Sequence, residues 1–232
     1  MKKHAYLALD FPTWQEAKRF LEEHQLKGVP VKVGMELFYR EGPRVIENLK
    51  ENNHPIFLDL KLHDIPTTVK RAMQNIAGLD VDLVNIHALG GRKMIEYAKE
   101  GLLAGGADQT KLIAVTILTS HDQETINDEL RIDGDLEQNV KHLAEISHKH
   151  GADGVVCSVN EVKLIKEICG KDFLTVTPGI RLKNTSVGDQ KRIATPRLAK
   201  KTGADQIVIG RSVTQAKDPK KAYEQVIKEW DN

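Results

Sequence analysis

Charged side chains alternate with leucines in the segment DLKLHD, residues 59–64. Asp59 and Lys61 are two positions apart, so in a β-strand they would point to the same face, and Asp64 follows in the turn. On spacing alone, an ordinary surface ion pair explains this pattern as well as a functional cluster does. The apolar residues 56–58 before it indicate a buried strand, where unpaired charged side chains are rare. This context favours a functional cluster over a surface ion pair.

A third strand-borne charge, Lys32, lies between two valines in the apolar segment VPVKVGM, residues 29–35. If it faces inward it needs a carboxylate, because an unpaired buried ammonium would lose its proton. Asp59 is the candidate partner. Alternating opposite charges can hold several ionised groups in one pocket, and such fixed charges can stabilise charge that develops during a reaction.

Two further segments have the composition of an anion site. IVIGRSV (207–213) places Gly210 and Arg211 directly after an apolar run, and TPGIR (177–181) supplies Pro178 and Arg181. Glycine allows close backbone approach, and the arginine fork matches a phosphate. One Gly-Arg pair is a weak signal, because an arginine at a helix start is often only solvated. The second arginine strengthens the prediction of a phosphate site.

The elements that must position these residues alternate along the chain. Short apolar and β-branched runs predict eight strands, at residues 5–10, 29–35, 55–62, 82–88, 111–118, 153–159, 173–179 and 206–210. Apolar spacing near 3.6 residues predicts helices between them, at residues 13–24, 43–53, 68–79, 92–105, 135–151 and 219–232.

This alternation predicts a parallel sheet with helices outside it. Eight units in 232 residues match an α/β (β/α)8 TIM barrel, with residues 1–232 as a single domain. The alternative is an open, doubly wound sheet, which usually shows GxGxxG after its first strand, whereas Phe11, Pro12 and Thr13 follow Asp10 here. A barrel gathers its site residues at the carboxyl ends of the strands. The candidate site residues at those ends are Asp10, Lys32, Asp59, Lys61, His87, Thr119, Ser120, Pro178, Arg181, Gly210 and Arg211.

Composition excludes several classes of function. The chain has 34 basic and 33 acidic residues, so its net charge of +1 gives no field that would recruit nucleic acid or an anionic membrane. The lack of a signal peptide or of a run of about 18 apolar residues predicts a cytoplasmic protein. Cys157 and Cys169 are predicted to be buried thiols. No metal-binding, Walker or nucleophile-elbow motif occurs, so we expect no metal and no cofactor.

Together these motifs resemble a known family. DLKLHDIPTTV (59–69) resembles the signature of the orotidine 5'-phosphate decarboxylases, in their shorter bacterial form. The resemblance covers essentially the whole chain, in the order ALDF (8–11), VKVGMELF (31–38), TILTS (116–120), TPGIR (177–181), DQKR (189–192) and IVIGRSV (207–213).

The resemblance implies an activity and roles for individual residues. Such enzymes convert orotidine 5'-phosphate (OMP) to UMP and CO₂ in de novo pyrimidine biosynthesis, without cofactor or metal, through a carbanion-like species at C6. Lys61 matches the proton donor to C6, and Asp59 matches the carboxylate near the departing CO₂. Lys32 and Asp64 complete the alternating Lys, Asp, Lys, Asp array. Both carboxylates would favour the charged form of Lys61.

The remaining site residues follow from the same resemblance. Asp10 and Lys32 match ribose contacts, Thr119 and Ser120 match contacts near the base, and Gln190, Gly210 and Arg211 with Arg181 match the phosphate grip. The family is homodimeric, and Asp64, Ile65 and Thr68 match residues that enter the neighbouring subunit's site. The polar segment 181–192 is typical of a mobile lid, with an ordinary surface loop as the alternative.

Two alternatives remain at this point. Related barrel enzymes of the keto-gulonate phosphate decarboxylase and hexulose phosphate synthase type share the Asp-x-Lys-x-x-Asp strand, but they carry a magnesium-binding glutamate where this chain has Lys32. A non-catalytic nucleotide-binding barrel would keep the phosphate grip without turnover. The intact charged array favours the decarboxylase over both.

Overall fold

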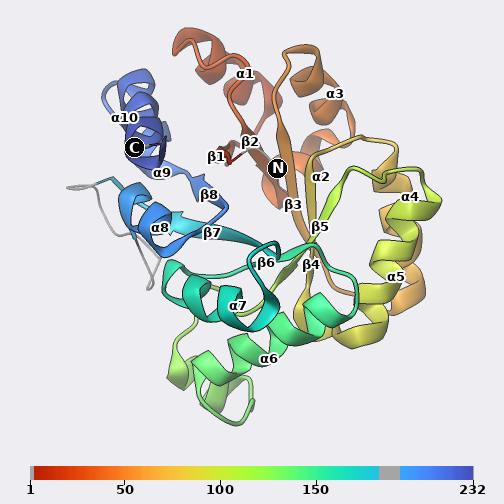
Figure 1. Cartoon of the computed structure of the whole chain (residues 1–232). Coiled ribbons are helices and arrows are strands. Elements are labelled where there is room, and N and C mark those ends of the chain that lie inside the picture. Colours follow the sequence, from red (N-terminus) through yellow and green to blue (C-terminus); the bar gives the residue numbers. More distant parts are fainter. Residues whose placement is uncertain (1–2, 183–193, 232) are drawn as a thin grey trace.

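Eight parallel strands close into a barrel at the centre of the molecule (Figure 1). The computed structural model describes residues 3–182 and 194–231. The strands follow one another around the barrel in chain order, and β1 pairs with β8 to close it. They are β1 (Ala5–Ala8), β2 (Val31–Gly34), β3 (Ile56–Leu62), β4 (Leu83–His87), β5 (Lys111–Val115), β6 (Gly154–Val156), β7 (Leu174–Ile180) and β8 (Gln206–Ile209). The prediction of a (β/α)8 barrel is confirmed, and the doubly wound alternative is wrong.

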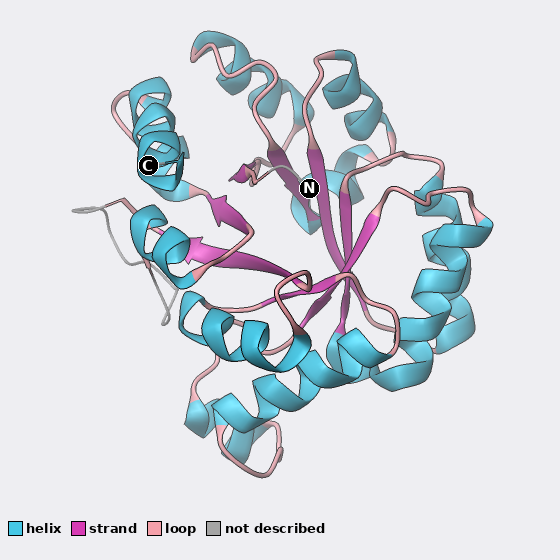
Figure 2. Ribbon diagram, in the orientation of Figure 1, coloured by secondary structure: helices cyan, strands magenta, loops and turns pink. Residues whose placement is uncertain are grey.

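The helices surround the strands (Figure 2). They are α1 (Trp14–Glu23), α2 (Met35–Glu41), α3 (Arg44–Glu51), α4 (Pro66–Ala77), α5 (Gly91–Ala104), α6 (Leu136–Lys149), α7 (Val162–Cys169), α8 (Pro196–Thr202), α9 (Arg211–Thr214) and α10 (Pro219–Asp231). Short helical segments, η1 to η3, cover Ala88–Gly90, Thr125–Glu129 and Val159–Glu161. All six predicted helices are present. The helices that the sequence did not predict, α2 and α7 to α9, have eight residues or fewer, too few for apolar periodicity to be clear.

Local sequence explains where several helices begin. The Thr13 hydroxyl accepts the Glu16 N–H at the start of α1, and the Asp135 carboxylate does the same for Gln138 at the start of α6. Such caps satisfy backbone donors that have no partner within the helix. Pro66 opens α4, where a missing N–H costs nothing. This start fixes the direction in which the chain leaves β3 and the charged segment.

The barrel has an inner and an outer apolar layer. Inside it, buried side chains from most of the strands pack together: Tyr6, Ala8, Phe57, Leu83, Ile113, Val176 and Val208. The alternate residues face outward and pack against the helices. A Cβ at Gly154 would lie 2.3 Å from the Leu174 carbonyl oxygen, so only glycine lets β6 approach β7 this closely. The inner layer fills the barrel toward the amino ends of the strands. Polar residues lie beyond it, at the carboxyl ends.

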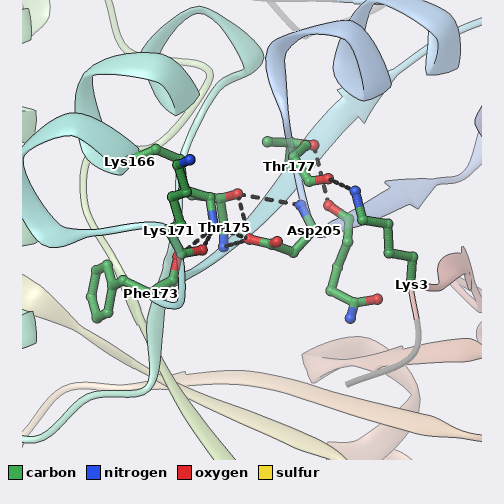
Figure 3. Close-up of polar contacts among 9 residues, drawn as sticks. Lys3, Lys166, Lys171, Phe173, Thr175, Thr177 and Asp205 are labelled. Carbon is green, nitrogen blue, oxygen red and sulfur yellow. Dashed lines mark hydrogen bonds and ion pairs between the residues drawn. The ribbon is translucent and has the colours of Figure 1, made fainter.

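The amino ends of the strands are joined by a repeated aspartate contact. One aspartate immediately precedes each of β4, β6 and β8, and its carboxylate accepts a backbone N–H near the start of the preceding strand. The pairs are Asp82 with Ile56 (2.7 Å), Asp153 with Leu112 (2.8 Å) and Asp205 with Thr175 (2.8 Å). Figure 3 shows the last of these, within a network that includes Lys166. This end of the barrel is therefore braced by polar contacts within the fold.

Cys157 and Cys169 are both buried, as predicted. Among the described residues, none of the helices has the length and apolar character needed to cross a membrane.

Candidate active site

A cavity of about 520 Å³ opens at the carboxyl ends of the strands. Its floor is apolar and its rim is polar. The floor residues are Ala8, Phe57, Val115, Val156 and Val208. The rim brings together most of the residues predicted from the sequence, namely Asp10, Lys32, Asp59, Lys61, Thr119, Ser120, Pro178, Arg181, Gly210 and Arg211. The structure thus places residues from seven of the eight strands and their following loops around one pocket.

A chain of alternating charges crosses this rim. The Lys32 ammonium lies 3.1 Å from Asp10 Oδ1 and 3.3 Å from Asp59 Oδ2, and the Lys61 ammonium lies 2.7 Å from Asp59 Oδ1. The side chains of Lys32 and Asp59 are each only 11% exposed. Two cations therefore share one buried carboxylate, and one of them also contacts Asp10.

Pairing keeps this cluster ionised despite its burial. Burial alone would lower the pKa of Lys32, but the carboxylates of Asp59 and Asp10 outweigh it, and the pKa is raised. Burial alone would raise the pKa of Asp59, but Lys32, Lys61 and the hydrogen bonds from Lys61 and Asn85 outweigh it, and the pKa is lowered. The site therefore holds fixed charges at neutral pH.

Lys61 reaches this position through an irregular backbone. Its φ is +52°, in the left-handed region that non-glycine residues rarely adopt. The register between β3 and β4 shifts at the same place, between Leu58 and Leu62. The alternation of a regular strand predicted that Asp59 and Lys61 share a face. The two side chains do meet, but a β-bulge aims the lysine.

The loop after β3 and the first turn of α4 carry three predicted site residues that lie outside the cavity. Asp64, Ile65 and Thr68 are exposed, and none of them lines the pocket. The Asp64 carboxylate accepts the N–H of the next residue, Ile65, at 2.6 Å. The pocket of one chain therefore holds three members of the predicted four-residue array.

The other side of the rim carries the two arginines. Gly210 follows β8 and precedes α9, which begins at Arg211, while Arg181 follows β7 and is buried. The Arg181 Nη1 donates to the Ile180 carbonyl at 2.9 Å, and the Arg181 backbone N–H donates to Ala194 at 2.8 Å. Gln190 and most of segment 181–192 lie outside the described residues, so the predictions of a phosphate contact and a lid there stay predictions.

The structure adds residues that sequence patterns did not mark. Asn85, fully buried on β4, bonds to Asp59 and to the backbone of Lys61. Thr214 and Gln215 line the pocket beyond Arg211. The only feature of the sequence that could have marked Asn85 as a site residue is its polar side chain within an apolar strand. His87, at the end of β4, is not among the cavity-lining residues and lies against His63, with ring centroids 5.5 Å apart.

The fold and the site together define a class. A closed (β/α)8 barrel with a cluster of paired lysines and aspartates on one side of its mouth and two arginines on the other is the architecture of a barrel enzyme that binds a small anionic substrate. The family model for the "Orotidine 5'-phosphate decarboxylase / HUMPS family" matches residues 4–226. The chain belongs to this family.

Individual relatives extend over the full chain. An orotidine 5'-phosphate decarboxylase of Bacillus pumilus is 54% identical over 234 residues, covering 100% of both chains. One of Geobacillus thermodenitrificans is 54% identical over 228 residues, covering 97% of this chain and 95% of the relative. The crystal structure of orotidine 5'-phosphate decarboxylase from Lactobacillus acidophilus superposes with a TM-score of 0.89 at 42% identity, covering 100% of both chains.

Proposed function

We propose that this protein decarboxylates OMP to UMP and CO₂, a step of pyrimidine biosynthesis. One observation carries the proposal: Lys32, Asp59 and Lys61 are in contact on one side of a cavity that has Arg181 and Arg211 on the other. The substrate has the matching parts, a carboxylated base at one end and a phosphate at the other. The family and the relatives named above support the same reaction. A cytoplasmic location stays a prediction.

Lys61 is the proposed proton donor. The bond between C6 and the carboxylate breaks, CO₂ leaves, and the electron pair remains on C6. The Lys61 ammonium stabilises this pair and gives C6 a proton, and the lysine is then reprotonated from solvent. A lysine suits this role because it combines a compact charge with a transferable proton, which an arginine would hardly release.

Asp59 and Lys32 hold that ammonium in place. Asp59 contacts Lys61 at 2.7 Å, next to where the substrate carboxylate would lie. Lys32 balances the charge of Asp59. Together with Asp10, which it also contacts, Lys32 is the proposed partner of the ribose hydroxyls. Because these charges are already paired in the folded protein, little reorganisation is needed when charge develops on C6. Thr119 and Ser120 are the proposed contacts near the base, and Pro178 completes the pocket wall.

The phosphate is bound far from the reacting carbon. Arg211, Gly210 and Arg181, with Gln190, are the proposed grip. Binding energy from a remote group can organise the charged site, so the grip contributes to rate as well as to affinity. Arg181 is well placed for this because it is buried and its backbone joins β7 to Ala194.

The protein is further proposed to act as a homodimer. Asp64, Ile65 and Thr68 are exposed beside the cavity without lining it, and Ile65 is 67% exposed. Other exposed large apolar side chains, Met35, Tyr39 and Leu89, belong to the segments that follow β2 and β4, the two neighbours of β3. An exposed apolar surface of this kind suits contact with a second copy of the chain, whose cavity would receive Asp64.

The direct test is the loss of orotate ring absorbance when purified protein is mixed with OMP. We expect turnover that persists in EDTA, because Lys32 occupies the place where a magnesium-dependent relative would carry a glutamate. Absence of any absorbance change at micromolar enzyme would refute the activity and leave a nucleotide-binding barrel. Loss of turnover in EDTA, restored by Mg²⁺, would instead support the sugar-phosphate type of chemistry.

A further inference from the structure

We propose that Asn85 is the positioning residue that holds Asp59 and Lys61 in their working geometry. Its side chain is fully buried on β4 and does not line the cavity, so it would act through its neighbours and not on substrate. Its Oδ1 accepts the backbone N–H of Lys61 at 2.7 Å, and its Nδ2 donates to Asp59 Oδ1 at 2.6 Å. One amide therefore bonds to both members of the proposed catalytic pair.

The first bond compensates for the β-bulge. From Leu58 to Leu62, β3 advances four residues, whereas the paired stretch of β4, from Val84 to Ile86, advances two. The Lys61 N–H lies in this mismatch, and the side-chain carbonyl of Asn85 accepts its hydrogen bond. A left-handed backbone conformation is strained for a non-glycine residue and persists only when the surrounding structure stabilises it. Asn85 supplies that stabilisation for Lys61.

The second bond sets the rotation of the Asp59 carboxylate. Oδ1 accepts both the Asn85 amide and the Lys61 ammonium, which leaves Oδ2 toward Lys32 at 3.3 Å. Only a side chain with an acceptor and a donor at one end can serve both partners. An ionised carboxylate has no donor for Asp59, and an apolar side chain has neither group. The residue type at position 85 is thus dictated by the two contacts.

The test compares N85A and N85D with a control, T175V, at the opposite end of the barrel. Thr175 is also fully buried, and its hydroxyl bonds to Asp205 at 3.0 Å. Because the inference rests on the proposed function, wild-type turnover of OMP is measured first. We expect N85A to lower kcat about 100-fold while KM for OMP changes by less than about threefold, because the lysine is misaligned and the phosphate grip is intact. T175V should lower the thermal midpoint but keep kcat within about twofold.

N85D provides a readout that a purely structural role would not change. The introduced carboxyl can donate to Asp59 and accept from Lys61 only when protonated, so kcat should fall with rising pH relative to the wild type. This nearly isosteric variant also decides the question if N85A does not fold. A pH profile parallel to that of the wild type, or N85A turnover within about threefold of the wild type, would overturn the inference. An inactive wild type would overturn the proposed function instead.

Discussion

Two lysine–aspartate clusters lie at opposite ends of the same barrel and are buried to a similar degree. At the mouth, the Lys32 and Asp59 side chains are each 11% exposed. At the other end lie Lys166 and Asp205, both drawn in Figure 3. Their side chains are 14% and 21% exposed. The two clusters differ in how many of their hydrogen-bond donors have partners. Lys166 donates to Asp205 and to the carbonyls of Lys171 and Phe173, at 2.6, 2.9 and 2.8 Å, which uses all three of its N–H groups.

The mouth cluster is arranged in the opposite way. Within residues 3–182 and 194–231, the Lys61 ammonium bonds only to Asp59, and it lines the cavity. Its backbone is in a strained conformation, whereas Lys166 belongs to the regular helix α7. The degree of burial therefore does not distinguish a functional charged cluster from a structural one in this molecule. Donors left open to a cavity, on a backbone held under strain, mark the end where we place the chemistry.

The largest effect is expected when one lysine is removed from each cluster. K61A should lower turnover of OMP by more than about 1,000-fold, because both the proton donor and the cation beside C6 are lost. UMP binding should stay measurable, since the phosphate grip is unchanged. K166M should keep kcat within about twofold but lower the free energy of unfolding by about 2 kcal/mol, because Asp205 loses its charged partner. Steady-state kinetics and denaturant unfolding of both variants provide these values.

The opposite result for either variant would contradict a catalytic role for Lys61 and a structural role for Lys166. Near-normal turnover in K61A would remove Lys61 as proton donor. A loss of kcat in folded K166M comparable to that in K61A would show that the two ends are coupled and that the comparison does not separate chemistry from stability.

The second prediction concerns Asp64, the charge that the single chain leaves outside its own cavity. D64A and K61A should each be nearly inactive alone. If subunits exchange at random, half of the dimers are hybrids with one intact site each, so mixing should restore about a quarter of wild-type activity. Mixing K61A with unrelated inactive protein is the control. Complete absence of rescue, with exchange verified by differently tagged subunits, would argue against a shared site.

The third prediction compares the two sides of the cavity itself. R211A should lower kcat/KM for OMP about 100-fold, because the remote phosphate loses a charged partner. The same substitution should hardly affect orotidine, which has no phosphate. T214V changes another pocket-lining residue on α9 without removing charge and serves as the control. Equal losses on both substrates would show that Arg211 acts on the pocket in general and not through phosphate.

Much of this arrangement could be predicted from the sequence, for physical reasons. Strand periodicity and helix periodicity are local, so they located all eight strands and the longer helices. A barrel brings the carboxyl ends of its strands together, so the residues found there could be assigned to one site from the sequence.

What could not be predicted depends on contacts between distant segments. The bulge at Lys61 arises from the register between β3 and β4, and the role of Asn85 arises from that bulge. His87 met the same positional criterion as the cavity residues, yet it packs against His63 and does not line the cavity. Position along a strand gives the end of the barrel at which a side chain lies, but not the neighbour that it meets.

The smallest predicted effect is a dependence of the folding stability on pH that arises from His87. Burial, then the charges of His63 and Lys61, lower the pKa of His87 to about 4, and its buried Nδ1 has no hydrogen-bond partner among the described residues. The unfolded chain, with an ordinary histidine pKa of about 6.5, binds more protons than the folded protein between these values. Stability from this group is therefore complete above about pH 6.5 and is lost as the pH falls toward 4.

We expect H87Q to lose less stability than the wild type between pH 7 and pH 4, by about 1–3 kcal/mol, in urea unfolding at each pH. H142Q changes an exposed histidine on α6 and should follow the wild type. Parallel curves for H87Q and the wild type would show that His87 takes up a proton as easily in the folded protein as in the unfolded chain.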